Sequence, residues 1–475
     1  MSVRGQYIVD SCGRVRIFHG INAVQKGFPW YPVFPNPPLL DPSYMKNLSD
    51  WGFNVIRLGI MWAGTEPQEG VYNETYLSIM KTIVESAQNN GIYVILDMHQ
   101  DVLSSQLAEY DGIPLWLYNK FPACVPDTCS ILHLPTVSIC YNYSCPFSAG
   151  TVSGTNWALG YLTSECSYKF QQLYHNNNGA VVSWSMFWNK IARTFGSYSN
   201  VLGYELINEP WAGDVYKNPA LLLPGVTGRL NLLPVYDKLN EAIRADDTES
   251  LLFYQPVTWG VVLNEVVAGT GFTRVPGGDQ YRNLSVLAYH WYCFTISIDP
   301  ANPTFAKTTC GVLGDSVFQS IRSDVKRTGG SSFLTEFGFD PTSPVDNQDN
   351  MFVLEKSDQY FQSWTVWGID FLDGTGNVED DIVLKFSRPY ARAIAGKPIS
   401  MFYDQDNTKC FTLTYILKAS IQCHTEIYLP PMVYDSNKVV TLSSQLQWMP
   451  NSGDANVIDV YNISTLPIGE FATIK

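Results

Sequence analysis

The chain has 475 residues, of which 45% are hydrophobic and 16% are charged, and its formal net charge is -14 at pH 7. This length and composition predict a folded protein with a large core and two domains, and they exclude a mainly disordered chain. The negative charge would repel the phosphates of nucleic acids at long range, so a nucleic-acid partner is disfavoured.

Short β-branched and aromatic runs alternate with helix-like stretches along most of the chain. This alternation is typical of a closed parallel barrel, and we predict an α/β protein with a (β/α)8 TIM barrel. A doubly wound open sheet is the alternative, but neither Gly269-Thr-Gly271 nor Gly374-Thr-Gly376 completes a GxGxxG motif. The predicted barrel strands cover residues 14–21, 54–60, 92–98, 201–207, 251–255, 286–292, 331–335 and 363–369, and the predicted helices cover residues 76–89, 184–195, 236–244 and 351–362.

After residue 393 the pattern changes to short alternating strands separated by turn residues. We therefore predict a catalytic barrel over residues 1–393 and a C-terminal antiparallel β-sandwich domain over residues 394–475. The Cys-rich segment near 110–174 is too long for an ordinary connection, and we predict a disulfide-braced loop over the barrel mouth. The predicted sandwich strands cover residues 410–416, 424–429, 438–443 and 455–461.

Ten cysteines without a CxxC or HExxH motif, together with five Asn-x-Ser/Thr sequons, predict a disulfide-bonded glycoprotein that is secreted or lumenal. The pairing stays open, although Cys410 and Cys423 are candidates to staple the sandwich. The N-terminus lacks the pattern of a signal peptide, so we expect that a leader has been removed or that Met1 was added for expression. No apolar run reaches the roughly 18 to 20 residues that cross a bilayer, which predicts a soluble or peripherally attached chain. The sequons begin at Asn47, Asn73, Asn142, Asn283 and Asn462.

Polar residues repeatedly end the apolar runs, and the carboxyl ends of barrel strands form the active site of this fold. Glu209 and Glu336 each follow a buried-strand pattern. One carboxylic acid that protonates a leaving oxygen and one carboxylate that attacks the anomeric carbon are sufficient for glycoside cleavage without a metal or cofactor. The other polar or aromatic residues near these strand ends are Arg57, His99, Asp101, Asn208, His290, Tyr292 and Trp364.

These residues carry a family resemblance. Asn208-Glu209-Pro210, His290-x-Tyr292, Glu336-Phe-Gly338 and Trp364 resemble glycoside hydrolase family 5, and residues 96–102, 203–213, 288–293 and 388–396 resemble the endoglycoceramidases and their relatives. The resemblance implies that Glu209 is the general acid/base and Glu336 the nucleophile. Since an acid must hold its proton near neutral pH, we expect burial or the charge of Glu336 to raise the pKa of Glu209.

The resemblance also implies roles for the surrounding residues. Arg57 and Tyr292 would stabilise the ionised nucleophile, and Asn208 would hold the sugar 2-hydroxyl. The carboxyl groups are expected about 5 to 5.5 Å apart, which is the retaining separation. A glucose-like sugar is expected to contact Lys26, His99, Asp101, His290 and Trp364, with Trp364 stacked on its apolar face.

Two features have open interpretations. Trp157, in the long loop, joins the sugar site or anchors the small core of its own loop. The aromatic and aliphatic segments at residues 28–35 and 259–263 line an apolar groove for lipid chains or pack against the Cys-rich loop. Glu205 is predicted to be a buried barrel residue with a hydrogen-bond partner, and Glu265 a solvated one.

The leading hypothesis is a monomeric O-glycosyl hydrolase, endoglycoceramidase-like, that cleaves the β-linkage between glycan and ceramide of a glycosphingolipid. Peripheral contact with a membrane or micelle is expected, because the substrate is a lipid. One alternative keeps the mechanism but changes the substrate to glucosylceramide, a steryl glucoside or a β-glucan. The other is a non-catalytic glycolipid-binding protein, which the presence of both glutamates disfavours.

Overall fold

The computed structural model describes most of the chain, and no helix within the described ranges is long and apolar enough to cross a membrane. The described residues are 1–107, 111–122, 130–133, 138–141, 158, 160–257, 269–293, 303–338, 340–418, 420–434, 438–463 and 471–475.

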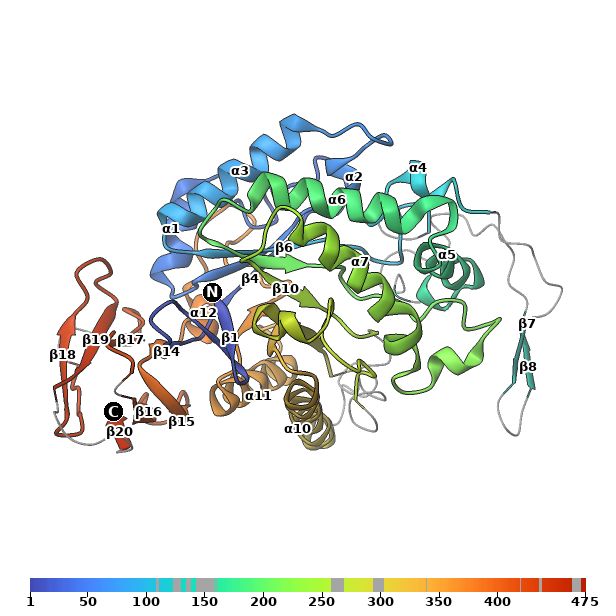
Figure 1. Ribbon diagram of the computed structural model, residues 1–475. Coiled ribbons are helices and arrows are strands. Elements are labelled where there is room, and N and C mark those ends of the chain that lie inside the picture. The colour runs from blue at the N-terminus through green and yellow to red at the C-terminus, as the bar shows by residue number, and fades with distance from the viewer. Residues whose placement is uncertain are drawn as a thin grey trace.

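Eight parallel strands close into a barrel, which confirms the predicted fold class. Their order around the barrel follows their order in the chain, and the last strand pairs with the first. Figure 1 shows the helices around the outside of this barrel and the C-terminal strands at one side of it. The barrel strands are β4 (His19–Ala23), β5 (Val55–Gly59), β6 (Tyr93–Asp97), β9 (Val201–Glu205), β10 (Leu251–Tyr254), β11 (Ser285–Trp291), β12 (Ser331–Phe337) and β13 (Trp364–Val366).

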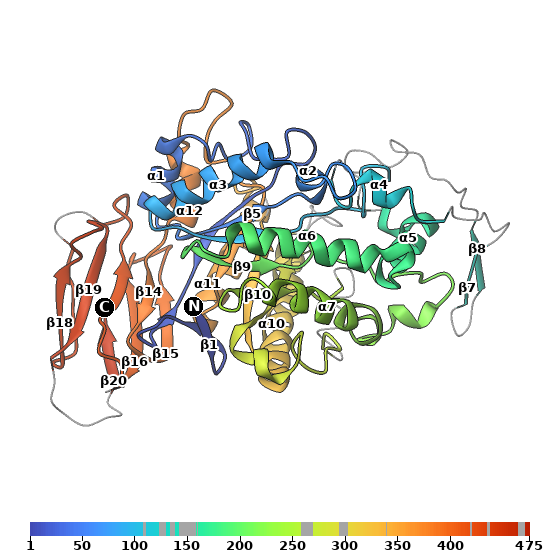
Figure 2. The same cartoon turned by 45° about the horizontal axis from the view of Figure 1, so that its top comes forward.

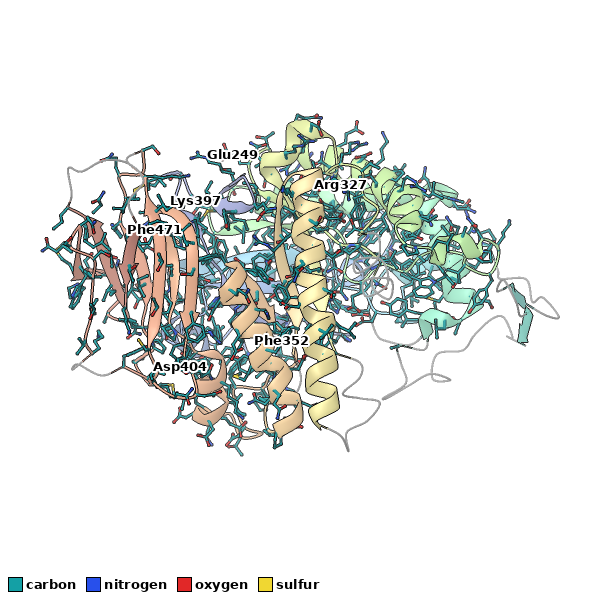
Figure 3. All side chains as sticks on the ribbon, turned by 90° about the horizontal axis from the view of Figure 1, so that it is seen from below. Glu249, Arg327, Phe352, Lys397, Asp404 and Phe471 are labelled. Carbon is teal, nitrogen blue, oxygen red and sulfur yellow. A yellow bond between two sulfur atoms is a disulfide. The ribbon has the colours of Figure 1, made fainter. Side chains whose placement is uncertain are left out.

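The four helices predicted from apolar periodicity are present, and each is longer at its amino end than predicted. Two begin at side-chain caps, because Asn73 accepts the amide of Tyr76 and Ser343 accepts that of Asp346. Figure 3 shows α10 (Pro303–Thr328) and α11 (Pro344–Tyr360) side by side, with Phe352 labelled where they meet. The four predicted helices are α3 (Glu74–Asn89), α6 (Ala180–Phe195), α7 (Leu233–Arg244) and α11 (Pro344–Tyr360).

The barrel interior is apolar at the amino end of the strands and polar at the carboxyl end. Val3 of β1 (Ser2–Arg4) and Ile8 of β2 (Tyr7–Val9) join the apolar cluster at the amino end. Strand side chains alternate in direction, so the residue two positions further along points inward as well. Polar inward residues therefore lie above an apolar floor. The apolar members include Val55, Ile95, Phe253, Ala288 and Phe333, and the polar residues two positions further on are Arg57, Asp97, Gln255, His290 and Thr335.

The second domain includes N-terminal strands that we had assigned to the barrel. β1, β2 and β3 (Val15–Arg16) extend the sheet of β14 (Tyr390–Ile394), so residues 14–16 pair there and the first barrel strand starts only at His19. The sheet order is β1-β2-β3-β14-β17-β19-β18, with β17 (Thr425–Tyr428), β18 (Leu446–Pro450) and β19 (Val457–Asn462). Figure 2 shows the N-terminus beside the C-terminal strands.

A three-stranded sheet packs against the first, and the two share one apolar cluster, as a sandwich requires. Its strands are β15 (Gly396–Tyr403), β16 (Phe411–Leu417) and β20 (Phe471–Ile474). The predicted strand at residues 438–443 is wrong, since only Leu442 makes an isolated bridge. The candidate pair Cys410 and Cys423 is also wrong: Cys423 is bonded to Cys12, which ties the chain start to this domain, and Cys410 is free.

The segment near 110–174 contains more regular structure than a loop. It holds α4 (Leu115–Tyr118), a hairpin of β7 (Ser130–His133) and β8 (Ser138–Tyr141), and α5 (Ser164–Tyr174). The predicted disulfide bracing stays a prediction, since most of the cysteines that would form it lie outside the described residues. Trp157, Glu265 and residues 259–263 lie outside the described residues as well.

Candidate active site

The two predicted catalytic glutamates lie next to each other at the carboxyl end of the barrel. Glu209 follows β9 and Glu336 lies near the end of β12. One oxygen of each carboxyl group and one ring nitrogen of His290, on β11, lie within 4.8 Å of one another. An approach this close fits the retaining separation of about 5 to 5.5 Å better than the roughly 6.5 to 9.5 Å of an inverting site.

Glu336 has the surroundings of an ionised nucleophile. Tyr292 donates its hydroxyl to Oε1 at 2.6 Å, and Arg57 Nη1 donates to Oε2 at 3.2 Å. Burial raises the pKa of Glu336 above its usual value, and the charge of Arg57 opposes this rise. Two donors on one carboxyl group favour its charged form, so Glu336 is the carboxylate of the pair. Arg57 and Tyr292 therefore lie where the sequence predicted them.

Arg57 is fully buried and connects the carboxylates of three strands. Its Nε donates to Glu205 Oε2 at 2.6 Å, its Nη2 lies 3.0 Å from Asp97 Oδ2, and Nη2 also donates to Asn208 Oδ1 at 2.8 Å. Burial lowers the pKa of Arg57, but the three neighbouring carboxylates outweigh it and raise the pKa overall. Glu205 is thus the buried, bonded residue that the sequence predicted. The contact with the 2-hydroxyl that we assigned to Asn208 stays a prediction.

Glu209 is held in an unusual backbone conformation and has the surroundings of a protonated acid. Its φ is 42°, in the left-handed region, where a non-glycine residue costs about 1–3 kcal/mol. Gln100 Nε2 donates to its carbonyl at 2.8 Å, and its amide donates to Gln255 Oε1 at 2.8 Å. Burial, followed by the charge of Asp101, raises the pKa of Glu209 to about 7. Burial rather than the charge of Glu336 is therefore the main cause of this shift.

The pKa of Glu209 predicts a basic limb in the pH profile. Because the first chemical step needs protonated Glu209, kcat/KM should fall about tenfold per pH unit above a pKa of about 7. Measuring kcat/KM for an unactivated glycolipid between pH 4 and 9 tests this expectation. The control is Glu209→Gln, which should lose the basic limb along with most of the activity. A basic limb that survives in this variant would assign the proton to another group.

Lys26, His99 and Asp101 form a charged cluster beside the glutamates. Lys26 pairs with Asp101, and His99 Nδ1 lies 2.8 Å from Asp97 Oδ2. Burial lowers the pKa of His99, but hydrogen bonds with Asp101 and Asp97 raise it to about 10. Burial raises the pKa of Asp101, whereas the charge of Lys26 and the bond to His99 bring it to about 2. The cluster thus presents both donors and acceptors beside the glutamates, and the contact of these three residues with sugar hydroxyls stays a prediction.

Asp111 belongs to the same cluster and was not predicted. Its Oδ1 accepts the amide of Asp101 at 2.9 Å, and its Oδ2 lies 3.9 Å from His99 Nε2. Burial and the charge of Asp101 raise its pKa to about 7. Gly112, with a φ of 105°, lets the chain next to Asp111 lie against the backbone of Leu103, since a Cβ on residue 112 would lie 2.1 Å from the carbonyl oxygen of Leu103. No strand ends at Asp111, so strand-end reasoning missed it.

The predicted sugar-stacking role of Trp364 is wrong. Its side chain is fully buried on the outer side of the barrel, stacked on His19 at 4.4 Å between ring centroids. Trp367 occupies the site instead: its ring stacks on His99 at 5.2 Å, and Lys26 Nζ lies 5.5 Å from its centroid. The strand period could have found it, because Trp367 shares the inward direction of Thr365, whereas Trp364 points outward.

Substitution of Trp367 should mainly affect activity, whereas substitution of Trp364 should mainly affect stability. Trp367→Ala should lower kcat/KM for a glycoside substrate about 10- to 100-fold, because a half-buried ring contributes about 1.5–3 kcal/mol of apolar contact, and it should leave the melting temperature nearly unchanged. Trp364→Ala should lower the free energy of unfolding by about 3–5 kcal/mol. Kinetics and thermal melts of both variants check this. An active, stable Trp367→Ala enzyme would remove Trp367 from the sugar site.

Comparisons with known proteins give the family and the fold of the chain. Residues 16–371 match the family described as "Cellulase (glycosyl hydrolase family 5)", and residues 388–475 match "Glycoside hydrolase family 5 C-terminal domain". The chain is 37% identical to an endoglycoceramidase of Cyanea nozakii, covering 87% of this chain and 80% of the relative, and 38% identical to one of Hydra vulgaris, covering 86% and 76%. Its fold resembles endo-glycoceramidase II from Rhodococcus sp. in a ganglioside GM3 complex, with a TM-score of 0.77, 21% identity and 99% of each chain covered.

Proposed function

This chain belongs to glycosyl hydrolase family 5, and we propose that it cleaves the β-linkage between glycan and ceramide of glycosphingolipids with retention of configuration. The observation that carries the proposal is the pair of glutamates within 4.8 Å, one bonded by two donors and the other with a pKa of about 7. The relatives from Cyanea nozakii and Hydra vulgaris support ceramide as the leaving group.

In the first step the carboxylate of Glu336 attacks the anomeric carbon. The glycosidic bond breaks, and the leaving ceramide oxygen takes the proton of Glu209. The products of this step are ceramide and a glycosyl ester on Glu336, with Glu209 ionised. Before the attack, Tyr292 and Arg57 hold the Glu336 carboxylate in place through the bonds described above.

In the second step Glu209 acts as the base. It takes a proton from water, the water oxygen attacks the anomeric carbon, and the ester bond to Glu336 breaks. The glycan leaves with its original β configuration, and both carboxyl groups return to their starting states. The raised pKa of Glu209 suits both roles, because a group that titrates near neutral pH can give up and take back a proton.

A lipid panel tests the substrate. Incubation with a ganglioside should release the intact oligosaccharide and ceramide, as read by mass spectrometry. Glucosylceramide, a steryl glucoside and a soluble β-glucan are the alternative substrates. If any of these is cleaved faster than the ganglioside, that compound and not a ceramide-linked oligosaccharide is the preferred substrate. The proposed mechanism would be unaffected by this result.

Contact with a lipid surface is the second part of the proposal. Phe28 directly follows the Lys26-Gly27 segment of the sugar cluster, and 88% of its side chain is exposed. Phe34, in the same loop, is 48% exposed, whereas Trp30 and Tyr31 pack against the barrel core. An exposed aromatic pair on a loop anchored beside the site is suited to enter the interface that holds the substrate.

Phe28→Ser should therefore weaken binding to ganglioside-containing vesicles about 10-fold or more, because burial of a Phe side chain contributes about 1.5–3 kcal/mol. Cosedimentation with vesicles measures the binding. Val439→Ser is the matched control, since Val439 is 85% exposed but lies in the C-terminal domain. If both variants bind vesicles like the wild type, the Phe28 loop does not contact the lipid surface.

A secreted or lumenal, N-glycosylated monomer completes the proposal. Two disulfides, Cys12–Cys423 and Cys293–Cys310, support an oxidising compartment. The sequon residues Asn283 and Asn462 are exposed and therefore accessible to glycosylation. Protein from a secretory host should lose mass on digestion with an N-glycosidase and should sediment as a monomer.

A further inference from the structure

Gln255 connects the acid/base to its histidine neighbour. It directly follows β10 and is 3% exposed. Its side chain contacts three groups: the amide of Glu209 lies 2.8 Å from Oε1, Glu205 Oε1 lies 2.5 Å from Nε2, and His290 Nε2 lies 2.9 Å from Nε2. Strand-end reasoning did not select Gln255, because a polar residue type alone does not show which groups it contacts.

These contacts fix the direction of every hydrogen bond in the group. A backbone amide can only donate, so the atom of Gln255 that faces Glu209 must be the carbonyl oxygen. The amide nitrogen then carries two hydrogens, one for Glu205 and one for His290. An amide nitrogen does not accept, so His290 Nε2 must present its lone pair.

The tautomer of His290 follows from this. A neutral imidazole with a lone pair on Nε2 carries its hydrogen on Nδ1. Nδ1 lies 2.8 Å from Glu209 Oε1, so it donates there. With Oε1 accepting from His290, the acidic proton of Glu209 is placed on Oε2.

We propose that Gln255 is a positioning residue: it holds His290 in the Nδ1-H tautomer and thereby keeps the acidic proton of Glu209 on Oε2, available to the leaving oxygen. In the other tautomer Nδ1 would accept, and the Glu209 proton would be donated to the ring instead of to the substrate. The inference rests on the proposed role of Glu209 as acid/base.

The ring of His290 is neutral in spite of the acidic groups around it. Burial lowers the pKa of His290, which favours the uncharged imidazole. Since His290 and Glu209 lie among charged groups from several strands, each of these groups bears on the pH dependence of the variants. The charged groups that act on the pair are Glu336, Arg57, Glu205, Asp97, Asp101, His99 and Lys26.

The experiment compares Gln255→Met with the wild type, because methionine has a similar length but donates no hydrogen bond. Nitrogen-15 histidine spectra of the wild type should show His290 neutral and protonated at Nδ1, and the variant should show Nε2-H. In the variant, kcat/KM for a ganglioside should fall about 100-fold, the scale of lost acid catalysis. For a 2,4-dinitrophenyl β-glycoside, whose leaving group needs no proton, kcat/KM should fall less than about threefold.

Gln362→Met is the matched control. Gln362 is equally buried, and its Nε2 donates to the carbonyl of Ser332 at 3.0 Å, but it lies at the amino end of the barrel. It should change stability without changing the ratio of the two kcat/KM values. Melting temperatures of both variants show how much each destabilises the fold.

Two results would overturn the inference: a wild-type His290 protonated at Nε2, or an equal fall in both substrates for Gln255→Met. Glu209→Gln separates this failure from failure of the proposed function. If Glu209→Gln shows the leaving-group difference and Gln255→Met does not, only the role of Gln255 is wrong. If Glu209→Gln shows no such difference, Glu209 is not the acid.

Discussion

Glu336→Gln should lower kcat for glycolipid hydrolysis by about 10⁶-fold, the scale seen when a covalent nucleophile is removed. The amide has the same shape but cannot form the glycosyl ester. A 2-fluoro glycoside, which slows the second step, should add the mass of its sugar to the wild-type peptide that contains Glu336. The variant should remain unlabelled. Mass spectrometry of the digested protein and an assay of released oligosaccharide measure both effects.

Glu66→Gln is the control for this experiment. Glu66 is also a buried glutamate, but its carboxylate accepts from Trp62 Nε1 at 2.9 Å and from the amide of Gly70 at 2.8 Å, outside the catalytic cluster. Its variant should retain hydrolysis and labelling. Labelling of a peptide other than that of Glu336 in the wild type would show that a different residue is the nucleophile.

Arg57→Met should be the most destabilising single change in the site. Removal of the guanidinium leaves Asp97, Glu205 and Glu336 close together in the barrel without their shared cation. Breaking a buried ion pair by removing one partner costs about 3–5 kcal/mol, because the remaining charge is uncompensated. We expect this loss in the free energy of unfolding from denaturant titration, together with a loss of activity.

Arg193→Met provides the comparison. The side chain of Arg193 is 68% exposed, and it pairs with Asp246 at 3.3 Å on the surface. Its replacement should change the free energy of unfolding by less than about 0.5 kcal/mol. A similar small effect for Arg57→Met would mean that the three carboxylates are neutralised by protons instead of by Arg57.

Strand-end reasoning found most of the site because the period of a strand is visible in the sequence. Parallel strands of a barrel bring their carboxyl ends together, and most of the site residues lie at or just beyond such an end: Asn208, Glu209, His290, Tyr292 and Glu336. Arg57 is the exception, because it lies in the middle of β5 and reaches the site from there. The reasoning failed where the position of a residue within the run decides whether its side chain points into or out of the barrel. Trp364 and Trp367 lie on the same segment, but only the alternation of inward and outward side chains separates them.

The N-terminal strands illustrate a second limit. The pattern of residues 14–21 predicts one strand, whereas the first part of this run pairs with β14 and the second part starts the barrel. The two parts differ in burial, since Arg14 and Arg16 are half-buried and β4 is buried along its whole length. No turn residue between Arg16 and His19 marks where one strand ends and the next begins. The disulfide between Cys12 and Cys423 is likewise a contact across almost the whole chain.

The sequence by itself determined the barrel, the C-terminal sandwich and the two carboxyl groups, because apolar periodicity and residue type are local properties. Only the tertiary structure decided which atoms meet. It placed Asp111 beside His99 and Trp367 over the same ring, and it buried Glu209 so that its pKa rises to about 7. It also put Gln255 between Glu209 and His290. Hydrogen-bond direction and desolvation depend on neighbours that are distant in the chain, so they cannot be read before the strands are closed into a barrel.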